Sequence, residues 1–279
     1  MTPKDRERAY EKRRYEEWQA RLAAKQARKR RVRSAAIVLS AVLTVFVIGG
    51  GFIVANLGDD DKDTAAATPS ETPTPAATTS AASDAKNPCD APPAKPAKPK
   101  SFKAAPPASD AKDKTWVFTM NTSCGKITIE LDGKKAPQAV SSMLQLGKAG
   151  YFDDTPCHRL VTDGIYVLQC GDPTGTGTGG PGYSYGPVEN APKGDLYKAG
   201  TVAMARQGGN GKSMGSQFFL VYKDSTIPSD AAGGYTVLGQ ITKGLDVVKT
   251  VADGGVSGGA GDGAPTRAVS ITSTSVSAG

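Results

Sequence analysis

Histidine is almost absent from this chain, which has only one, His158, among 279 residues. Catalytic zinc sites and Ser-His-Asp triads both depend on histidine, and the adjacent Cys157 and Arg159 do not suggest a triad. The four cysteines form no CxxC pair, which argues against a zinc ribbon and a thioredoxin-like redox site. We therefore expect no metal and no cofactor.

Apolar residues are also scarce, at 38% of the chain, so part of it is expected to build no hydrophobic core. The net charge of +7 is unevenly distributed. Residues 1–33 hold 13 basic and 5 acidic side chains, which leaves a net charge of −1 for all the rest. The basic character therefore belongs to an amino-terminal tail, and it does not indicate that the main domain binds nucleic acid.

The segment Ser34–Leu57 contains no charged residue, and its 24 residues are enough to span a hydrocarbon core of ~30 Å as a helix. A basic cluster precedes it and an acidic one follows it. The positive-inside rule predicts a cytoplasmic tail over 1–33, a transmembrane signal-anchor over 34–57, and an extracytoplasmic remainder. A cleaved signal peptide is the alternative, but the apolar run is long and lacks a clear cleavage site.

Residues 58–112 are rich in Ala, Thr, Pro and Lys, a composition that predicts a disordered linker. This assignment places Cys89 in the linker and leaves Cys124, Cys157 and Cys170 in a folded domain over 113–279. An oxidising compartment would permit one disulfide among those three, but the sequence does not determine the pairing.

The folded region alternates short β-prone runs with glycine-rich loops. Residues 115–120 and 126–131 predict a hairpin, 136–149 an amphipathic helix that Gly150 closes, and 244–251 a second helix. Further strands are expected over 157–161, 165–170, 200–205, 217–221, 236–241 and 268–276. This pattern predicts a mainly β fold, a closed antiparallel eight-stranded barrel with two helices that cap its ends.

The most distinctive segments are CHRLV, GIYVLQCGDPTGTGTGGPGYSYG, AGTVAMARQG, GSQFFLVY and YTVLGQI, in that order. In these segments the chain resembles the cyclophilin family of peptidyl-prolyl cis-trans isomerases, over roughly residues 115–276. The tail, span and linker in front of this region resemble membrane-anchored cyclophilins of Gram-positive actinobacteria. The resemblance implies a cyclophilin-like fold and catalysis of proline cis-trans isomerisation, with proline-containing segments of exported polypeptides as substrates.

The resemblance implies that Arg159 stabilises the twisted prolyl amide and that Gln169 holds the substrate backbone. Arginine suits this role because it stays charged and its planar donors are rigid. The residues that by resemblance bind the substrate are Tyr166, Val167, Met204, Ala205, Arg206, Gln217, Phe219, Ile227, Tyr235 and Leu238. For Arg206 only the backbone is implied, and His158 is expected to be structural because the reaction needs no proton transfer.

Several positions depart from the family pattern. Tyr166 stands where phenylalanine is usual, Val167 replaces a longer side chain, and Tyr235 occupies the usual histidine position. Thr226 lies near the place of the tryptophan that marks cyclosporin-sensitive members, so we expect weak cyclosporin binding. We further expect a monomer. Two alternatives to catalysis remain: a proline-peptide-binding module or holdase, and a cell-wall spacer or adhesin.

Overall fold

A computed structural model describes residues 88–111 and 113–279. The predicted tail, the predicted transmembrane segment and most of the predicted linker lie outside these residues. Within the described ranges, no helix is both long enough and apolar enough to cross a membrane. The predicted membrane span at 34–57 therefore stays a prediction.

The first two strands form the predicted hairpin. Strand β1 (Thr115–Thr122) pairs with β2 (Gly125–Asp132) in an antiparallel register that sets Phe118 opposite Ile129 and Met120 opposite Ile127. These four side chains are buried, because alternate residues of a strand point to the same face of the sheet. The alternation read from the sequence is confirmed here.

Most of the other strands are short. These other strands are β3 (Thr155–Pro156), β4 (Arg159–Val161), β5 (Val167–Cys170), β6 (Leu196–Tyr197), β7 (Thr201–Met204), β8 (Phe218–Val221), β9 (Ser225–Thr226), β10 (Val237–Lys243), β11 (Asp262–Gly263) and β12 (Ser270–Ala278). The sequence did not predict β3, β6, β9 or β11, since two-residue strands leave no periodic pattern.

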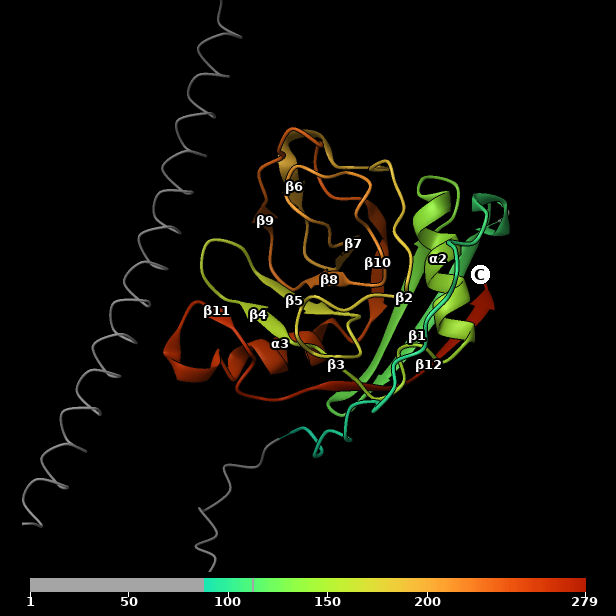
Figure 1. The fold of residues 1–279 in the computed structure, drawn as a ribbon. Helices are drawn as coiled ribbons and strands as arrows, with labels where there is room; N and C mark the ends of the chain where they lie inside the picture. The colour runs from blue at the N-terminus through green and yellow to red at the C-terminus, as the bar shows by residue number, and fades with distance from the viewer. Residues whose placement is uncertain (1–87, 112) are drawn as a thin grey trace, which may run out of the picture. The chain divides into compact units, whose positions relative to one another are not determined.

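Ten strands form one sheet in the order β11-β4-β5-β8-β7-β10-β2-β1-β12-β3, and β6 pairs separately with β9 (Figure 1). The sheet contains ten strands, not the eight that were expected. No ladder of the described residues joins its end strands, β11 and β3, so closure of the barrel is not shown. Only Cys157 and His158 separate β3 from β4 along the chain. What the structure supports is a mainly β half-barrel accompanied by helices.

In the part of the chain that the structure describes, two α-helices accompany the sheet, as predicted. Helix α2 (Pro137–Lys148) begins with a proline, whose missing N–H costs nothing at that position. It packs beside β1, β2 and β12 (Figure 1). A Cβ atom at Gly147 would lie 2.5 Å from the Phe118 ring, so this close approach requires glycine. Helix α3 (Leu245–Asp253) buries Val248 and Val251.

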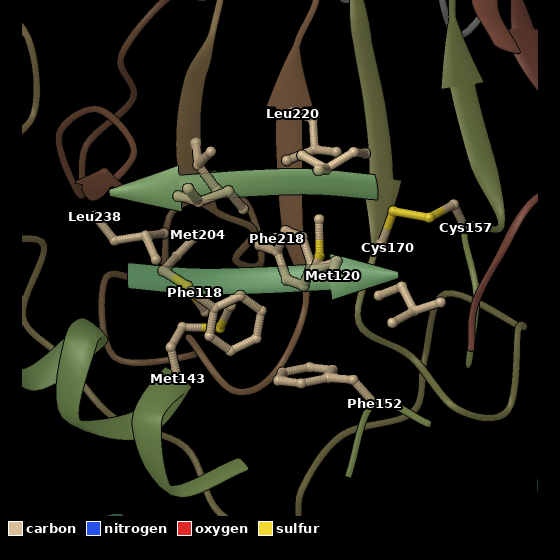
Figure 2. Packing of buried hydrophobic residues seen from close by; sticks show 14 of the residues in the cluster. Phe118, Met120, Met143, Phe152, Cys157, Cys170, Met204, Phe218, Leu220 and Leu238 are labelled. Atoms are coloured by element: carbon tan, nitrogen blue, oxygen red, sulfur yellow. A yellow bond between two sulfur atoms is a disulfide. The ribbon is translucent and has the colours of Figure 1, made fainter. Parts of the chain in front are cut away.

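The main hydrophobic core lies between the sheet and α2. Figure 2 shows side chains from both strands of the hairpin, from α2 and from β8 meeting there. Phe152 stands edge-on to Phe118 and to Phe218, with ring centroids 6.1 and 5.8 Å apart. Such aromatic pairs stabilise a core by more than their buried area alone.

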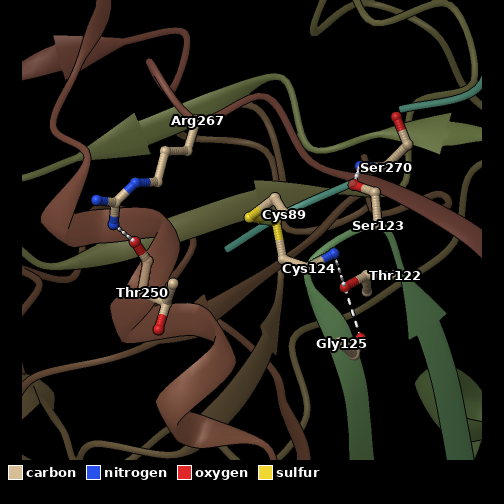
Figure 3. The surroundings of a disulfide bond; sticks show 8 residues. All are labelled: Cys89, Thr122, Ser123, Cys124, Gly125, Thr250, Arg267 and Ser270. Carbon is tan, nitrogen blue, oxygen red and sulfur yellow. Dashed lines mark hydrogen bonds between the residues drawn. A yellow bond between two sulfur atoms is a disulfide. The ribbon is translucent and has the colours of Figure 1, made fainter. Parts of the chain in front are cut away.

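Residues 88–111 cross the surface of the domain as a strap, which we define by that range. A disulfide joins Cys89 to Cys124 in the β1–β2 turn (Figure 3). Lys95 donates to the Thr174 carbonyl at 2.8 Å, and the Ser141 hydroxyl of α2 donates to the Ala108 carbonyl at 3.0 Å. The strap therefore belongs to the folded domain, and the predicted boundary at residue 112 lies too far along the chain.

A second disulfide joins Cys157 to Cys170 inside the main core. The expectation of one bridge among three cysteines is thus replaced by two bridges that use all four. Sequence reasoning excluded Cys89 because its surroundings are rich in proline and lysine. Its partner is 35 residues away, and only the folded hairpin brings the two together.

Candidate functional site

A row of side chains crosses four adjacent strands on one face of the sheet. In the register of the ladder, Arg159 of β4 faces Gln169 of β5, and Gln169 faces Phe219 of β8. Phe219 in turn faces Ala203 of β7. Directly opposed residues share a face, so the guanidinium, the amide and the aromatic ring lie side by side. The candidate site is built on this row, which is polar at the Arg159 end and apolar at the Phe219 end.

The apolar end of the row belongs to a cluster separate from the main core. Its buried members are Val161, Val167, Tyr197, Ala203, Phe219, Val221 and Ile227, and Ile165, Ala205, Tyr235 and Val237 pack against them. We call this set the outer cluster. Phe219 and Ile227 keep 5% and 8% of their surface exposed, so the cluster reaches the surface beside Arg159.

The structure brings most of the predicted site residues to this face. Arg159, Gln169 and Gln217 form the polar part, while Val167, Ala205, Phe219, Ile227 and Tyr235 belong to the outer cluster. It separates three others. Met204 and Leu238 are completely buried in the main core, and Tyr166 packs against that core, edge-on to Tyr222.

Strand geometry explains this separation. Neighbouring residues on a strand point to opposite faces, so Tyr166 and Val167 cannot both line the same pocket, nor can Met204 together with Ala203 and Ala205. Leu238 is likewise separated from Val237. A motif match assigns adjacent residues to the same site, whereas the pleat of the strand directs their side chains to opposite faces of the sheet. Ile165, which the sequence reasoning did not select, joins the outer cluster instead.

Each of the three guanidinium nitrogens of Arg159 donates a hydrogen bond. Its Nε and Nη2 atoms donate to the two carboxylate oxygens of Asp262, each at 2.8 Å, and Nη1 donates to Gln169 Oε1 at 3.0 Å. Hydrogen bonding and charge from Asp262 raise the pKa of Arg159 above its usual value, although burial opposes this. The guanidinium therefore remains a cation with a defined orientation.

The hydrogen bonds continue from Gln169 in a single direction. Because a guanidinium only donates, Gln169 must turn its carbonyl oxygen toward it, and its Nε2 then donates to Gln217 Oε1 at 2.8 Å. Gln217 Nε2 donates onward to the carbonyls of Gly177 and Gly179, at 3.0 and 2.9 Å. Both amide groups are oriented by this chain of donors.

The glycine-rich loop that receives Gln217 is organised by Asp172. This fully buried carboxylate accepts bonds from the backbone N–H groups of Thr174, Thr176, Gly177 and Gly179. Burial alone would raise the pKa of Asp172, but these bonds and the Thr174 hydroxyl lower it below its usual value. Asp172 thus stays ionised and holds the carbonyls against which Gln217 is fixed.

His158 lies beneath the same loop, near the position a Cβ atom would occupy at Gly177. Both of its ring nitrogens are buried and have no hydrogen-bond partner within the described part of the chain. Burial lowers the pKa of His158 below its usual value, so the ring is neutral at pH 7. The arrangement fits a packed structural residue, consistent with the expectation from the sequence.

Two acidic residues of this region were missed by sequence reasoning: Asp172 and Asp262. Asp172 and Asp262 lie in glycine-rich segments, and nothing in the local pattern indicates which cations or N–H groups they meet. Asp262 is 103 residues from Arg159. A composition rich in glycine with one acid is the only signal available, and it is too weak to select them.

Comparison with known proteins now gives these residues a context. Residues 117–276 match the family model "Cyclophilin type peptidyl-prolyl cis-trans isomerase/CLD". A probable peptidyl-prolyl cis-trans isomerase B of Mycobacterium tuberculosis is 44% identical over 167 residues, which cover 56% of this chain and 52% of that protein. The chain therefore spans about half the length of this mycobacterial relative.

A peptidyl-prolyl cis-trans isomerase of Helicobacter pylori is 39% identical over 145 residues, 51% of this chain and 84% of that protein. Among solved structures, a cyclophilin-type peptidyl-prolyl cis-trans isomerase of Cryptosporidium parvum superposes with a TM-score of 0.50 and 26% identity, covering 59% of this chain and 99% of that one. The family match includes at least part of every strand of the sheet and both helices. This chain belongs to the cyclophilin-type peptidyl-prolyl cis-trans isomerase family.

Proposed function

We propose that this chain catalyses the cis-trans isomerisation of X–Pro peptide bonds in polypeptides. The observation that carries the proposal is the row of Arg159, Gln169 and Phe219 beside the outer cluster. It joins one fixed cation and one oriented amide to an apolar surface that suits a proline ring. Family membership supports the same activity.

The reaction needs only a lower rotational barrier. Partial double-bond character gives the peptide C–N bond a barrier of ~18–20 kcal/mol, whereas the two X–Pro isomers differ by ~0.5–1 kcal/mol. In the twisted amide the prolyl nitrogen regains a lone pair. A guanidinium N–H that donates to this lone pair favours the twisted state over both planar isomers, which accelerates both directions equally.

In this mechanism the outer cluster holds the proline ring while the acyl side turns. Within the cluster, the Phe219 ring stands edge-on to Tyr235 at a centroid distance of 5.5 Å and lies 6.3 Å from the Tyr197 ring. Gln169 lies between the ring and the cation, where it can bind the substrate backbone. No acid, base or nucleophile takes part.

The test is the isomerisation rate of a short proline peptide, measured by NMR exchange between its cis and trans signals, with the full chain in mild detergent. We expect Arg159→Ala to lower kcat/KM by roughly 10²–10³-fold, as for removal of a preorganised charge-stabilising donor. Arg267→Ala is the matched control, because Arg267 binds the Thr250 carbonyl near the end of α3 (Figure 3). Undiminished activity in Arg159→Ala would refute the role of Arg159. Wild type that binds the peptide without accelerating exchange would favour the binding module.

We further propose that the domain works outside the cytoplasm, anchored through residues 34–57, on exported polypeptides. The charge bias around that segment supports this orientation. The two disulfides support it as well, since such bonds persist mainly in oxidising compartments. Protease protection of residues 1–33, but not of 88–279, in intact cells would test the topology.

Weak cyclosporin binding also remains a proposal. Thr226 is exposed on β9, opposite Leu196, and offers neither a flat apolar surface nor an indole donor. A titration that gave the affinity typical of sensitive family members would contradict it.

A further inference from the structure

The contact between Arg159 and Asp262 has no role in the mechanism above, yet it is the most extensive contact that the guanidinium makes. Both carboxylate oxygens of Asp262 accept a bond, from Nε and from Nη2, each at 2.8 Å. Such a side-on, two-bond pair fixes the plane of the guanidinium as well as its position, which a single contact cannot do.

We propose that Asp262 is a positioning residue for isomerisation, which orients the guanidinium of Arg159 toward the prolyl nitrogen. The proposal rests on the proposed function. Asp262 does not touch the substrate in this scheme and acts only through Arg159.

The fold places Asp262 beside Arg159. Strand β11 pairs with β4 so that Asp262 faces Val161, and Val161 is two residues from Arg159 on the same face. Asp262 and Arg159 are thus diagonal neighbours across an antiparallel pair, within reach of a long side chain. The neighbouring Gly261 carbonyl accepts a bond from the Thr162 N–H at 2.8 Å, which ties the segment to the end of β4.

The loop that carries β11 is itself anchored. Ser257 N–H donates to the Ala264 carbonyl at 2.8 Å, and Thr266 N–H donates to the Gly255 carbonyl at 2.9 Å. Val256 is buried in the main core. The carboxylate therefore comes from a supported turn, as a residue that sets another residue's geometry requires.

Because the Arg159–Asp262 pair is partly exposed, it can orient the guanidinium while contributing little to folding stability. The side chains of Arg159 and Asp262 are 40% and 48% exposed. Ion pairs with this much solvent contact contribute little to folding stability. What the pair does restrict is the rotamer freedom of a long, half-exposed arginine, which is large when no partner holds it.

The donor count shows what remains for the substrate. A guanidinium has five N–H groups, of which Asp262 takes two and Gln169 takes one. The two that neither residue engages belong to Nη1 and Nη2, the terminal nitrogens. One N–H group on Nη1 and one on Nη2 therefore remain available to the substrate.

The test uses Asp262→Asn in the full chain. Asparagine keeps the shape, but its NH₂ group opposes one of the arginine donors. We expect kcat for a short proline peptide to fall roughly tenfold while KM stays unchanged, since misplacing a catalytic group costs rate and the outer cluster still binds the ring. Asp262→Glu, which retains the charge, should recover part of the loss. Asp163→Asn, on the exposed loop after β4, is the charge-matched control.

A double-mutant cycle distinguishes positioning from other roles. If Asp262 acts through Arg159, then Asp262→Asn should cause no further loss in an Arg159→Ala background. The Nε–H signal of Arg159 should also exchange faster with water in Asp262→Asn, a readout that does not depend on turnover.

Three results would overturn the proposal: full kcat in Asp262→Asn, an undiminished effect in the Arg159→Ala background, or a fall in the unfolding midpoint that alone accounts for the lost rate. Wild type that does not accelerate exchange would refute the proposed function instead, and the Nε–H measurement would still test the orientation of Arg159.

Discussion

The guanidinium of Arg206 lies over the ring of Tyr235, with its central carbon 4.6 Å from the ring centroid. The Arg206 side chain is completely buried, and it donates to both oxygens of Asp230 at 2.9 Å and to the Gly233 and Gly234 carbonyls. Tyr235 stands edge-on to Phe219. The sequence implied only a backbone role for Arg206, whereas its side chain supports one wall of the outer cluster.

Asp230→Asn should therefore destabilise the domain strongly. It leaves the buried Arg206 charge without its counter-ion, and breaking a buried pair costs about 3 kcal/mol or more in the free energy of unfolding. Urea denaturation measures this cost. The control is Asp224→Asn, whose ion pair with Lys198 is exposed to solvent and should contribute little to stability. Equal effects of the two substitutions would contradict the support role.

The pH dependence of that difference follows from the pKa of Asp230, which hydrogen bonds from Arg206 lower to about 2. A carboxylate with a lowered folded pKa stabilises the fold above its unfolded pKa, and this contribution is lost as pH falls through the folded value. The gap in unfolding free energy between wild type and Asp230→Asn should thus be constant near neutral pH and narrow from about pH 4 toward pH 2. If the difference in unfolding free energy between wild type and Asp230→Asn widened on acidification, the lowered pKa of Asp230 would be contradicted.

The direction of the amide chain predicts the effect of Gln169→Glu. The carboxylate can still accept from Arg159, but it places an oxygen 2.8 Å from Gln217 Oε1, where Gln169 now donates. We expect kcat to fall about tenfold, equivalent to about 1.4 kcal/mol in the barrier. Gln138→Glu is the matched control, since Gln138 donates to the Pro106 carbonyl on the strap. Full activity in Gln169→Glu would show that the donor to Gln217 is dispensable.

The Cys89–Cys124 disulfide predicts that the strap stabilises the domain. Replacing both cysteines by serine opens a loop with a sequence separation of 35, which should lower the free energy of unfolding by about 3–4 kcal/mol. Denaturation of the full chain measures the loss. Protease cleavage within 88–111 should accelerate in the same variant, while the Lys98→Ala variant, with the bond intact, should resemble wild type. Unchanged stability would contradict the prediction that the strap stabilises the domain.

His158 predicts a pH dependence that can be assigned to one residue, because the chain has no other histidine. Burial lowers the pKa of His158 in the folded state, so the unfolded chain binds the proton more readily. Stability should therefore be greatest above the ordinary histidine pKa of 6.5 and decline as pH falls below it. Thermal unfolding from pH 7.5 to 5 measures this, and His158→Gln should flatten the profile. An equal slope in that variant would assign the titration elsewhere.

Local patterns in the sequence were sufficient for the elements that depend on local physics. Alternation between 115 and 131 predicted the β1–β2 hairpin, and the apolar spacing after Pro137 predicted α2. The resemblance to cyclophilins was also available from the sequence, because its motifs are short contiguous segments that can be recognised without knowing the fold. The resemblance implied Arg159, Gln169 and Gln217 as site residues before any geometry was known, and the structure joins their side chains by hydrogen bonds.

Tertiary structure decided everything that depends on partners distant in the chain. It assigned Cys89 to Cys124, Asp262 to Arg159 and Asp230 to Arg206, since a carboxylate or thiol looks the same in sequence whichever partner it meets. It also decided which of two adjacent residues faces the site, because the pleat of a strand sends neighbours to opposite sides. The sequence by itself determined which groups could do the chemistry, and the ladder register determined which of them meet.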